Sequence, residues 1–345
     1  MRFMSVEDIE TGQLLGRTVY SANGTVLLSA GVQLTVYMIS TLKRIGVTML
    51  YIKDSNFEDV EIEDILSEGT KQAIFHEMSE TLEAIRSGKE WSTRKISATV
   101  DTLLTDVLNN KEVLLQLTEI RTKDNAAYIH AVNVCLLTSM IGLNMGLNYT
   151  QLKDLAIGAL LHDIGKSLPL PDGADKDDPK NHHTWRGFEL LKHKREFNLL
   201  IAHTALQHHE QLNGSGLPRG LDHEAIHLFA KIVAVANTYD NLISGEGSNE
   251  GRALLPHEAC EKLMASSERE LDRDVLVEFT RIVSVYPTGT SVRLSTKETG
   301  VVVSQHRGLP GRPVVRIVHG SGEDMEVREV DLANETTLFI EAVLA

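Results

Sequence analysis

A run of histidine and aspartate residues in the middle of the chain has the residue types that bind divalent metals. Ten of the 14 histidines lie between His130 and His227. Within this region, the segment LLHDIGK ends an apolar run with His162 and Asp163 and adds Lys166. Imidazole and carboxylate are good ligands for divalent ions, and Asp163 has two oxygens with which to bridge two of them. Lys166 adds a positive charge that can bind a phosphate, so the segment indicates metal-assisted phosphate chemistry.

Further histidines extend the pattern. His130 lies on an apolar helical repeat, His183 stands just before a predicted helix, and the pair His208 and His209 ends another. Each position alone is typical of a hydrogen-bonded or surface histidine. Taken in order along one set of helices, they supply enough ligands for two metals. A helical bundle whose histidines are only structural is the alternative.

The elements that must position these side chains are predicted to be helices. Apolar periodicity indicates helices over 96–120, 124–146 and 150–166, the last with Thr150 as its N-cap. Others are expected at about 184–193, 197–209, 223–243, 256–269 and 272–285. The fold class is therefore mainly α, a helical bundle over 96–286 between two smaller modules.

The flanking segments have other patterns. Residues 1–55 are typical of a small α+β module, with Asn23 and Gly24 at a hairpin tip. Residues 56–95 indicate a helical connector that breaks at Gly88, and a connector helix is compatible with a homodimer. Residues 287–345 have the alternation and turn residues of a small β-rich module.

Composition excludes several classes of function. A net charge of -14 argues against binding to duplex nucleic acid or to a membrane surface, because both require a basic face. The two cysteines, Cys135 and Cys260, cannot form a disulfide framework or a thiolate metal cage. The most apolar stretch, VNVCLLTSMIGL, is too short to span a bilayer. We expect a soluble, cytoplasmic protein with no membrane span.

The order of these residues resembles the HD-GYP family, a branch of the HD phosphohydrolase superfamily, over residues 96–286. The family pattern is a helical histidine, then HDIGK, HxxxG and HHExxDGxGYP, and a late aspartate. The matching positions here are His130, 162–166, 183–187 and 208–218. The resemblance implies an HD-type helical bundle with two divalent transition metals, iron or manganese, with zinc and nickel as alternatives. Such a centre hydrolyses cyclic di-GMP to pGpG or GMP with a metal-activated water.

The resemblance also implies a role for each matching residue. Asp163 would bridge the two ions and act with Lys166 as a catalytic residue. The implied metal ligands are His130, His162, Asp163, His183, His208, His209 and Asn237. The implied substrate-binding residues are Lys166, Asn213, Gly214, Gly216 and Leu217.

The sequence departs from the family pattern at several positions. Asn237 replaces the late aspartate, although Asp240 follows three residues later. Ala126 stands where some members have the glutamate of a third metal, so two metals are expected. Asn213 and Leu217 replace the aspartate and tyrosine of the loop, and asparagine can still form an Asx turn there. The family's later arginine and tyrosine motif is missing, since Arg252 is out of register.

These departures leave several functions open. The leading hypothesis is a cyclic di-GMP phosphodiesterase. A second is a receptor or interaction module that retains metal and binds a cyclic dinucleotide, a GGDEF-type cyclase or another signalling protein. A third is a mononucleotide phosphohydrolase of the wider superfamily.

Overall fold

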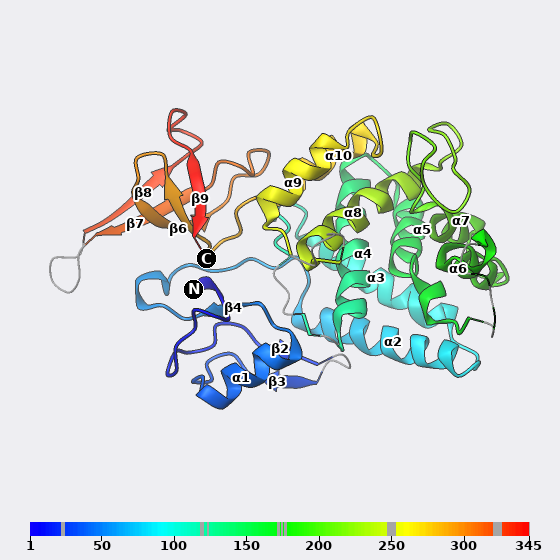
Figure 1. Ribbon diagram of the computed structural model, residues 1–345, viewed down its shortest axis with the longest axis horizontal. Helices are drawn as coiled ribbons and strands as arrows, with labels where there is room; N and C mark the ends of the chain where they lie inside the picture. The colour runs from blue at the N-terminus through cyan, green and yellow to red at the C-terminus, as the bar shows by residue number, and fades with distance from the viewer. Residues whose placement is uncertain are drawn as a thin grey trace. The chain divides into compact units, whose positions relative to one another are not determined.

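The computed structural model describes residues 1–21, 25–117, 121–122, 124–170, 173, 175, 178–246, 253–319 and 326–344 (Figure 1). The predicted hairpin tip, Asn23 and Gly24, and Arg252 lie outside the described residues. The chain forms two compact units. The β-rich unit consists of Met1–Asp64, Glu112–Ala126 and Arg281–Ala345, and the helical unit of Ile65–Lys111 and Ala127–Thr280.

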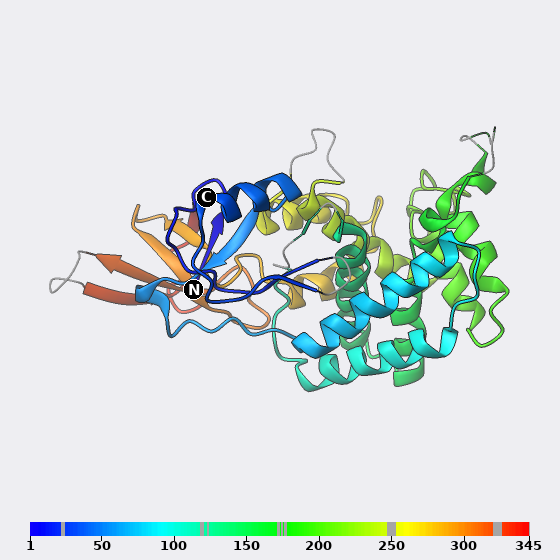
Figure 2. The same cartoon turned by 90° about the horizontal axis from the view of Figure 1, so that it is seen from below.

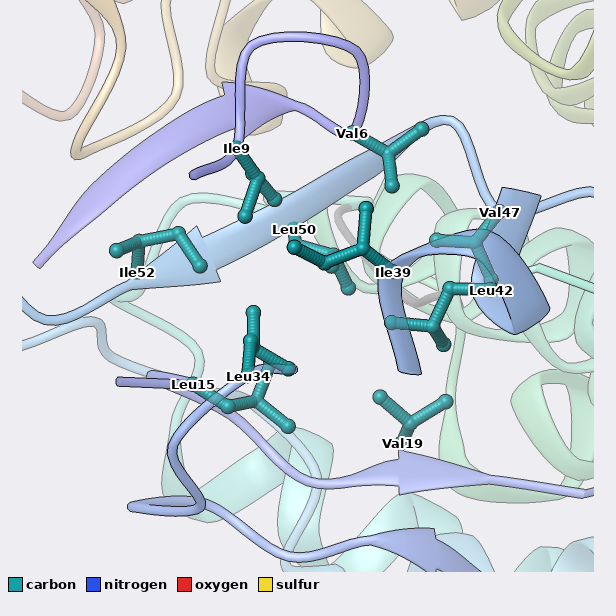
Figure 3. Close-up of a cluster of buried hydrophobic side chains, with 10 residues drawn as sticks. All are labelled: Val6, Ile9, Leu15, Val19, Leu34, Ile39, Leu42, Val47, Leu50 and Ile52. Carbon is teal, nitrogen blue, oxygen red and sulfur yellow. The ribbon is translucent and has the colours of Figure 1, made fainter. Parts of the chain in front are cut away.

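The N-terminal part of the β-rich unit is built from two short strand pairs and one helix. Strand β1 (Arg2–Ser5) pairs antiparallel with β4 (Met49–Ile52), and β2 (Val19–Tyr20) with β3 (Val26–Leu28). Helix α1 (Val36–Ile45) begins where the Thr35 side chain accepts a hydrogen bond from the Met38 amide. Figure 3 shows the apolar side chains that α1 and the strands bury together: Val6, Ile9, Leu15, Val19, Leu34, Ile39, Leu42, Val47, Leu50 and Ile52.

The C-terminal part of this unit is a five-stranded antiparallel sheet with the order β8-β7-β6-β5-β9. Its strands are β5 (Ser291–Leu294), β6 (Thr299–Ser304), β7 (Val314–His319), β8 (Glu326–Asp331) and β9 (Ile340–Leu344). In β7, Val315 and Ile317 are fully buried. Arg316 between them forms ion pairs with Asp59 and Glu329. This alternation places one face of the sheet on an apolar core, and it confirms the predicted β-rich module.

The helical unit carries most of the helices. They are α2 (Glu68–Arg86), α3 (Thr93–Asn109), α4 (Ala126–Asn144), α5 (Tyr149–Leu160), α6 (His183–Lys192), α7 (Leu199–Gln207), α8 (Leu228–Ser244), α9 (Pro256–Ala265) and α10 (Arg273–Ile282). Short 3-10 turns, η2 (Ile164–Ser167) and η3 (Pro179–Asn181), precede α6. Figure 2 shows α2 and α3 side by side, where they contact each other. The prediction of a mainly helical bundle flanked by smaller α+β and β parts is confirmed.

Helix α4 is apolar on all sides, with 14 of its 19 residues buried. A helix without a polar face is stable in water only inside a protein core. Among the described residues, it is the one helix long and apolar enough to cross a membrane, and 78% of its apolar window is buried in the protein. Burial to this extent identifies α4 as a core helix.

Several of the predicted helices differ from the structure at their ends. The helix predicted over 96–120 ends at Asn109. Asn110 turns away from helical geometry and donates a side-chain hydrogen bond to the Ile65 carbonyl, and Leu115 donates its amide to the Ile282 carbonyl. The predicted Thr150 N-cap is also wrong. Asn148 begins α5, because its side chain and that of Gln151 satisfy each other's amides in a capping box.

Helix α8 begins five residues later than predicted. The segment 223–227 forms a turn, and α8 begins after His227, whose ring accepts a hydrogen bond from the Phe229 amide. The predicted 150–166 helix similarly ends at Leu160 and continues as η2. In both cases, histidine side chains bind backbone groups that a longer helix would have used.

Candidate metal centre

The site is built around the chain reversal after α5. Leu160 is the last residue of the helix, His162 and Asp163 follow, and η2 begins at Ile164. The last carbonyls of a helix lack backbone donors. His162 supplies one, because its Nδ1 donates to the Ala159 carbonyl at 2.7 Å. This hydrogen bond directs the other ring nitrogen, Nε2, away from the helix and toward Asp163.

His208 repeats this arrangement at the end of α7. It is the C-cap residue of the helix, and its Nδ1 donates to the Ala205 carbonyl at 2.9 Å. Burial lowers the pKa of His208 to about 3, so the ring is neutral at physiological pH. A neutral ring that carries its proton on Nδ1 has a lone pair on Nε2. The hydrogen bond to Ala205 therefore leaves Nε2 of His208 available to bind a metal.

His130 reaches the same place from the interior of α4. Its Nδ1 donates to Oδ2 of Asp240 at 2.7 Å, and the Asn133 side chain donates to the other oxygen of that carboxylate at 2.9 Å. The Nε2 atoms of His130 and His162 lie 3.1 Å apart. Since both rings use Nδ1 as a donor, their two lone pairs face each other. A separation of roughly 3 Å fits two neighbouring ligands that are each about 2.0–2.1 Å from one ion.

Asp163 lies between two groups of imidazoles. Its Oδ1 is 3.1 Å from Nε2 of His183 and 3.6 Å from Nε2 of His208. These three atoms are buried and have no hydrogen-bond partner within the part of the chain that the structure describes. Buried polar atoms without partners are destabilising, so their convergence is the signature of a ligand that completes them.

Two overlapping sets of ligand atoms, each within 4.8 Å, meet at Asp163. One set contains His130, His162 and Asp163, and the other Asp163, His183, His208 and His209. Neutral imidazoles and a shared carboxylate are a donor set for two divalent transition metals. The residues therefore fit a two-metal centre, and the identity of the metal is a separate question.

Electrostatics keep Asp163 ionised. Burial alone would raise its pKa, but the imidazoles of His162, His183 and His208 around it hold the pKa of Asp163 well below its usual range. Lys166 adds an ion pair, with its Nζ 2.6 Å from Oδ2. The lysine side chain is 53% exposed, so its charge is also accessible to a ligand that approaches from solvent.

Gly165 determines how closely α6 approaches. A Cβ at this position would lie 2.0 Å from the His183 carbonyl oxygen, which no side chain can tolerate. The glycine thus lets the first turn of α6 pack on η2, and this packing brings the His183 ring to Asp163. His182, which the sequence reasoning did not single out, packs on the His183 ring with centroids 4.3 Å apart.

The loop after His209 has the predicted local shape. Asn213 accepts a hydrogen bond from the Ser215 amide at 3.0 Å, so the predicted Asx turn is confirmed, and Gly214 has a φ of +75°. A Cβ at Gly216 would lie 2.2 Å from the Gln211 amide nitrogen. Leu217 is 55% exposed. Contact between these residues and a substrate stays a prediction.

Glu210 anchors this loop. Its buried carboxylate accepts the backbone amides of Arg219 at 2.9 Å and Leu221 at 2.8 Å. No role for Glu210 was predicted from the sequence. The sequence feature that could have indicated this role is its position directly after the candidate ligands His208 and His209, where the chain must be held in place.

The two polar residues of α8 occupy different environments. Asn237 is buried, and its side-chain oxygen accepts a hydrogen bond from Asn241 at 3.2 Å. Asp240, three residues later, supplies the carboxylate that holds His130. The ligand role of Asn237 stays a prediction. One sequence feature could have indicated a buried carboxylate here. Asn133 is a polar residue one helical turn after His130 in a largely apolar helix, and its side chain donates to Asp240.

Comparison with known proteins identifies the class. A family model described as "HD domain" matches residues 103–275, half of the chain, and a second, "KOW domain associated with HD domain", matches residues 291–345. The chain therefore belongs to the HD domain family. The second match coincides with the five-stranded sheet.

Individual relatives are cyclic dinucleotide phosphodiesterases. A cyclic di-GMP phosphodiesterase from Pseudomonas aeruginosa is 32% identical over 234 residues, which cover 64% of this chain and 55% of the relative. Another from Thermotoga maritima is 30% identical over 181 residues, 50% of this chain and 48% of the relative. The 3'3'-cGAMP-specific phosphodiesterase 1 from Vibrio cholerae is 28% identical over 164 residues, 44% of this chain and 38% of the relative.

The chain spans about half the length of the curated relatives it matches. It is homologous to HD-GYP cyclic di-GMP phosphodiesterases, as the resemblance of its motifs implied.

Proposed function

We propose that this protein is a metal-dependent phosphodiesterase that hydrolyses cyclic di-GMP to pGpG or GMP. The observation that carries the proposal is the convergence of Asp163 Oδ1 with Nε2 of His183 and Nε2 of His208, all three buried and without hydrogen-bond partners among the described residues. In this proposal residues 96–286 form the catalytic domain, and residues 1–55, 56–95 and 287–345 are accessory.

The ligand sets would hold two divalent metals, iron or manganese, with Asp163 shared between them. When bound, the metals supply charge stabilisation for a phosphoryl group and an acidified water as nucleophile. The chain's own residues orient this chemistry. Backbone carbonyls fix the rings of His162 and His208, and Asp240 fixes His130. Lys166 places an exposed ammonium beside the centre, where it can meet phosphate oxygens.

A turnover assay tests the proposal. Metal-loaded protein under reducing conditions should convert cyclic di-GMP to pGpG or GMP, as resolved by ion-exchange chromatography. His162→Ala should abolish this conversion, and an exposed substitution in the same unit, His193→Ala, should not. Failure of the wild-type protein to convert cyclic di-GMP, 3'3'-cGAMP or pGpG would rule out the hydrolytic function.

Asn237 favours a second candidate, a receptor that retains metal and binds the dinucleotide without hydrolysing it. An amide oxygen brings no charge to the centre, so metal and substrate would be held less favourably for turnover. Such a receptor would pass the signal to a GGDEF-type cyclase or another signalling protein. Dinucleotide binding without turnover in the wild-type protein, with turnover gained in Asn237→Asp, would favour this candidate.

A further inference from the structure

An apolar cavity opens beside the candidate metal centre within the helical unit. Its volume is about 180 Å³, and Asp163, His130 and Lys166 form part of its lining. Ligand sites for drug-sized molecules span roughly 300–1,000 Å³. The cavity is therefore too small for a whole dinucleotide, and its size suits one nucleobase.

One wall of this cavity comes from α2, a helix outside the segment that matches the HD domain model. Met78, Leu82 and Arg86 line it, spaced four residues apart, which places them in one row along a helix. Met78 and Leu82 are buried, whereas Arg86, the last residue of α2, is exposed. This side of α2 thus contributes two buried apolar side chains and one exposed guanidinium group to the cavity.

Other lining residues come from α4, the end of α5 and η2. Ala127 and Ala131 line the cavity one turn apart, with Leu160 and Ile164 beside them. The side chains on α4 are small and leave space, and most of the cavity lining is apolar. A flat aromatic base gains free energy when it is buried between such walls, whereas a phosphate would lose its hydration there.

The rim has charges that match guanine. Lys166 is engaged with Asp163, but no carboxylate lies within ion-pair distance of Arg86 among the residues that the structure describes. Glu246 also lines the cavity. Guanine has acceptors at O6 and N7, which arginine binds bidentately, and N–H donors on its other edge, which suit a carboxylate. Adenine has an amino donor where guanine has O6, so it would meet Arg86 unfavourably.

We propose that this cavity is a guanine-binding subsite, in which Arg86 recognises the O6 and N7 edge of one base of a cyclic dinucleotide held at the metal centre. The inference rests on the proposed function for the class of ligand. It assigns to α2 a role in specificity that the HD motif residues do not supply.

The test measures binding of hydrolysis-resistant phosphorothioate analogues of cyclic di-GMP and cyclic di-AMP to the metal-loaded full chain by calorimetry. Arg86→Gln should raise the Kd for the guanine analogue about tenfold, the loss expected for one bidentate base contact, and should change the Kd for the adenine analogue less than twofold. Ala127→Phe, at an exposed position on the cavity wall, should weaken binding of both analogues. Metal content and thermal melting confirm that each variant is folded.

Arg94→Gln is the matched control, since Arg94 is an exposed arginine on α3 that does not line the cavity. It should bind both analogues as the wild-type protein does. Equal weakening of the two analogues by Arg86→Gln, unchanged binding in Arg86→Gln or Ala127→Phe, or no binding of either analogue to the wild-type protein would overturn the inference. Discrimination by Arg86 without turnover of natural cyclic di-GMP would instead retain the subsite and contradict the proposed hydrolysis.

Discussion

The two units of the molecule bury different kinds of side chain. In the β-rich unit, the clusters around Leu42 and Val302 are apolar, and charged residues such as Arg316 form ion pairs at the surface. In the helical unit, an equally buried interior contains His162 and Asp240, both with no exposed side-chain surface. The apolar clusters of the first interior follow the usual preference for apolar residues, whereas the second also buries imidazole and carboxylate groups around Asp163.

This difference separates stability from function. Apolar burial stabilises a fold, whereas buried polar atoms without partners destabilise it. Burial of Asp163, His183 and His208 without partners makes an unfavourable contribution to the free energy of folding, and a bound ligand can offset this contribution. We therefore expect substitutions in the helical site to change metal binding and turnover, and substitutions in the β-rich core to change stability.

The largest effect is expected for Asp163→Asn. The substitution removes the negative charge shared by both ligand sets, so the metal content should fall well below that of the wild-type protein. Loss of a residue that only hydrogen-bonds to a metal ligand costs up to roughly 100-fold, and any dinucleotide turnover should fall by more than this in Asp163→Asn. Elemental analysis and chromatography of products measure the two effects. A variant with full metal content and wild-type turnover would contradict the site.

A smaller loss is expected for Asp240→Asn. Asp240 fixes the His130 ring but belongs to neither set of ligand atoms, so metal affinity should fall by about 10–100-fold. Competition with a chelator measures the affinity. Asp274→Asn, an exposed change in the first turn of α10, is the control and should leave it unchanged. Equal affinities in all three proteins would show that Asp240 does not position the ligand.

The opposite behaviour is expected for Leu42→Ala in the β-rich unit. Leu42 is 2% exposed in the cluster around α1, so its truncation should lower the free energy of unfolding by about 2–5 kcal/mol. The metal content of the folded protein should not change. Val36→Ala, a 70% exposed position on the same helix, should alter stability by less than about 0.5 kcal/mol. Urea titration measures the free energy of unfolding of both variants. Loss of metal in Leu42→Ala would contradict the separation of stability and metal binding between the two units.

The smallest effect concerns the thiols of the helical unit. Burial raises the pKa of both Cys135 and Cys260 to about 12. Because the thiolate is the reactive form, only about one molecule in 10⁴ would carry it at pH 8. Both thiols should react slowly with a disulfide reagent in the native protein, faster as the pH rises toward 12, and rapidly once urea unfolds the chain. Fast reaction at pH 8 without urea would show that these helices are more open than the structure.

Much of the fold could be predicted from local patterns. Apolar helical segments located α4 and α7, and the alternation around Val315 and Ile317 indicated the C-terminal strands. The errors fall at helix ends, such as Asn109 and Asn148, where side-chain hydrogen bonds decide the first or last turn. Those bonds depend on partners that periodicity does not reveal.

The candidate site was predicted less evenly. The order of histidines indicated both ligand sets, because each ring lies at a helix end or on a buried helix face. Asp240 and Glu210 were not assigned their roles, since both act by hydrogen bonds to groups distant in the sequence or to backbone amides. The cavity lined by Arg86 could not be foreseen, because it requires the packing of α2 against α4 and η2, which are distant from it in the sequence.

The sequence by itself determined which side chains could bind a metal, which segments are helical and which strands alternate. These are properties of residue type and spacing, which act locally. Only the tertiary structure decided that Asp163 lies between two groups of imidazoles, that Asp240 supports His130, and that α2 closes a cavity beside them. These arrangements depend on how helices pack, and packing is set by close contacts such as that of Gly165 with His183.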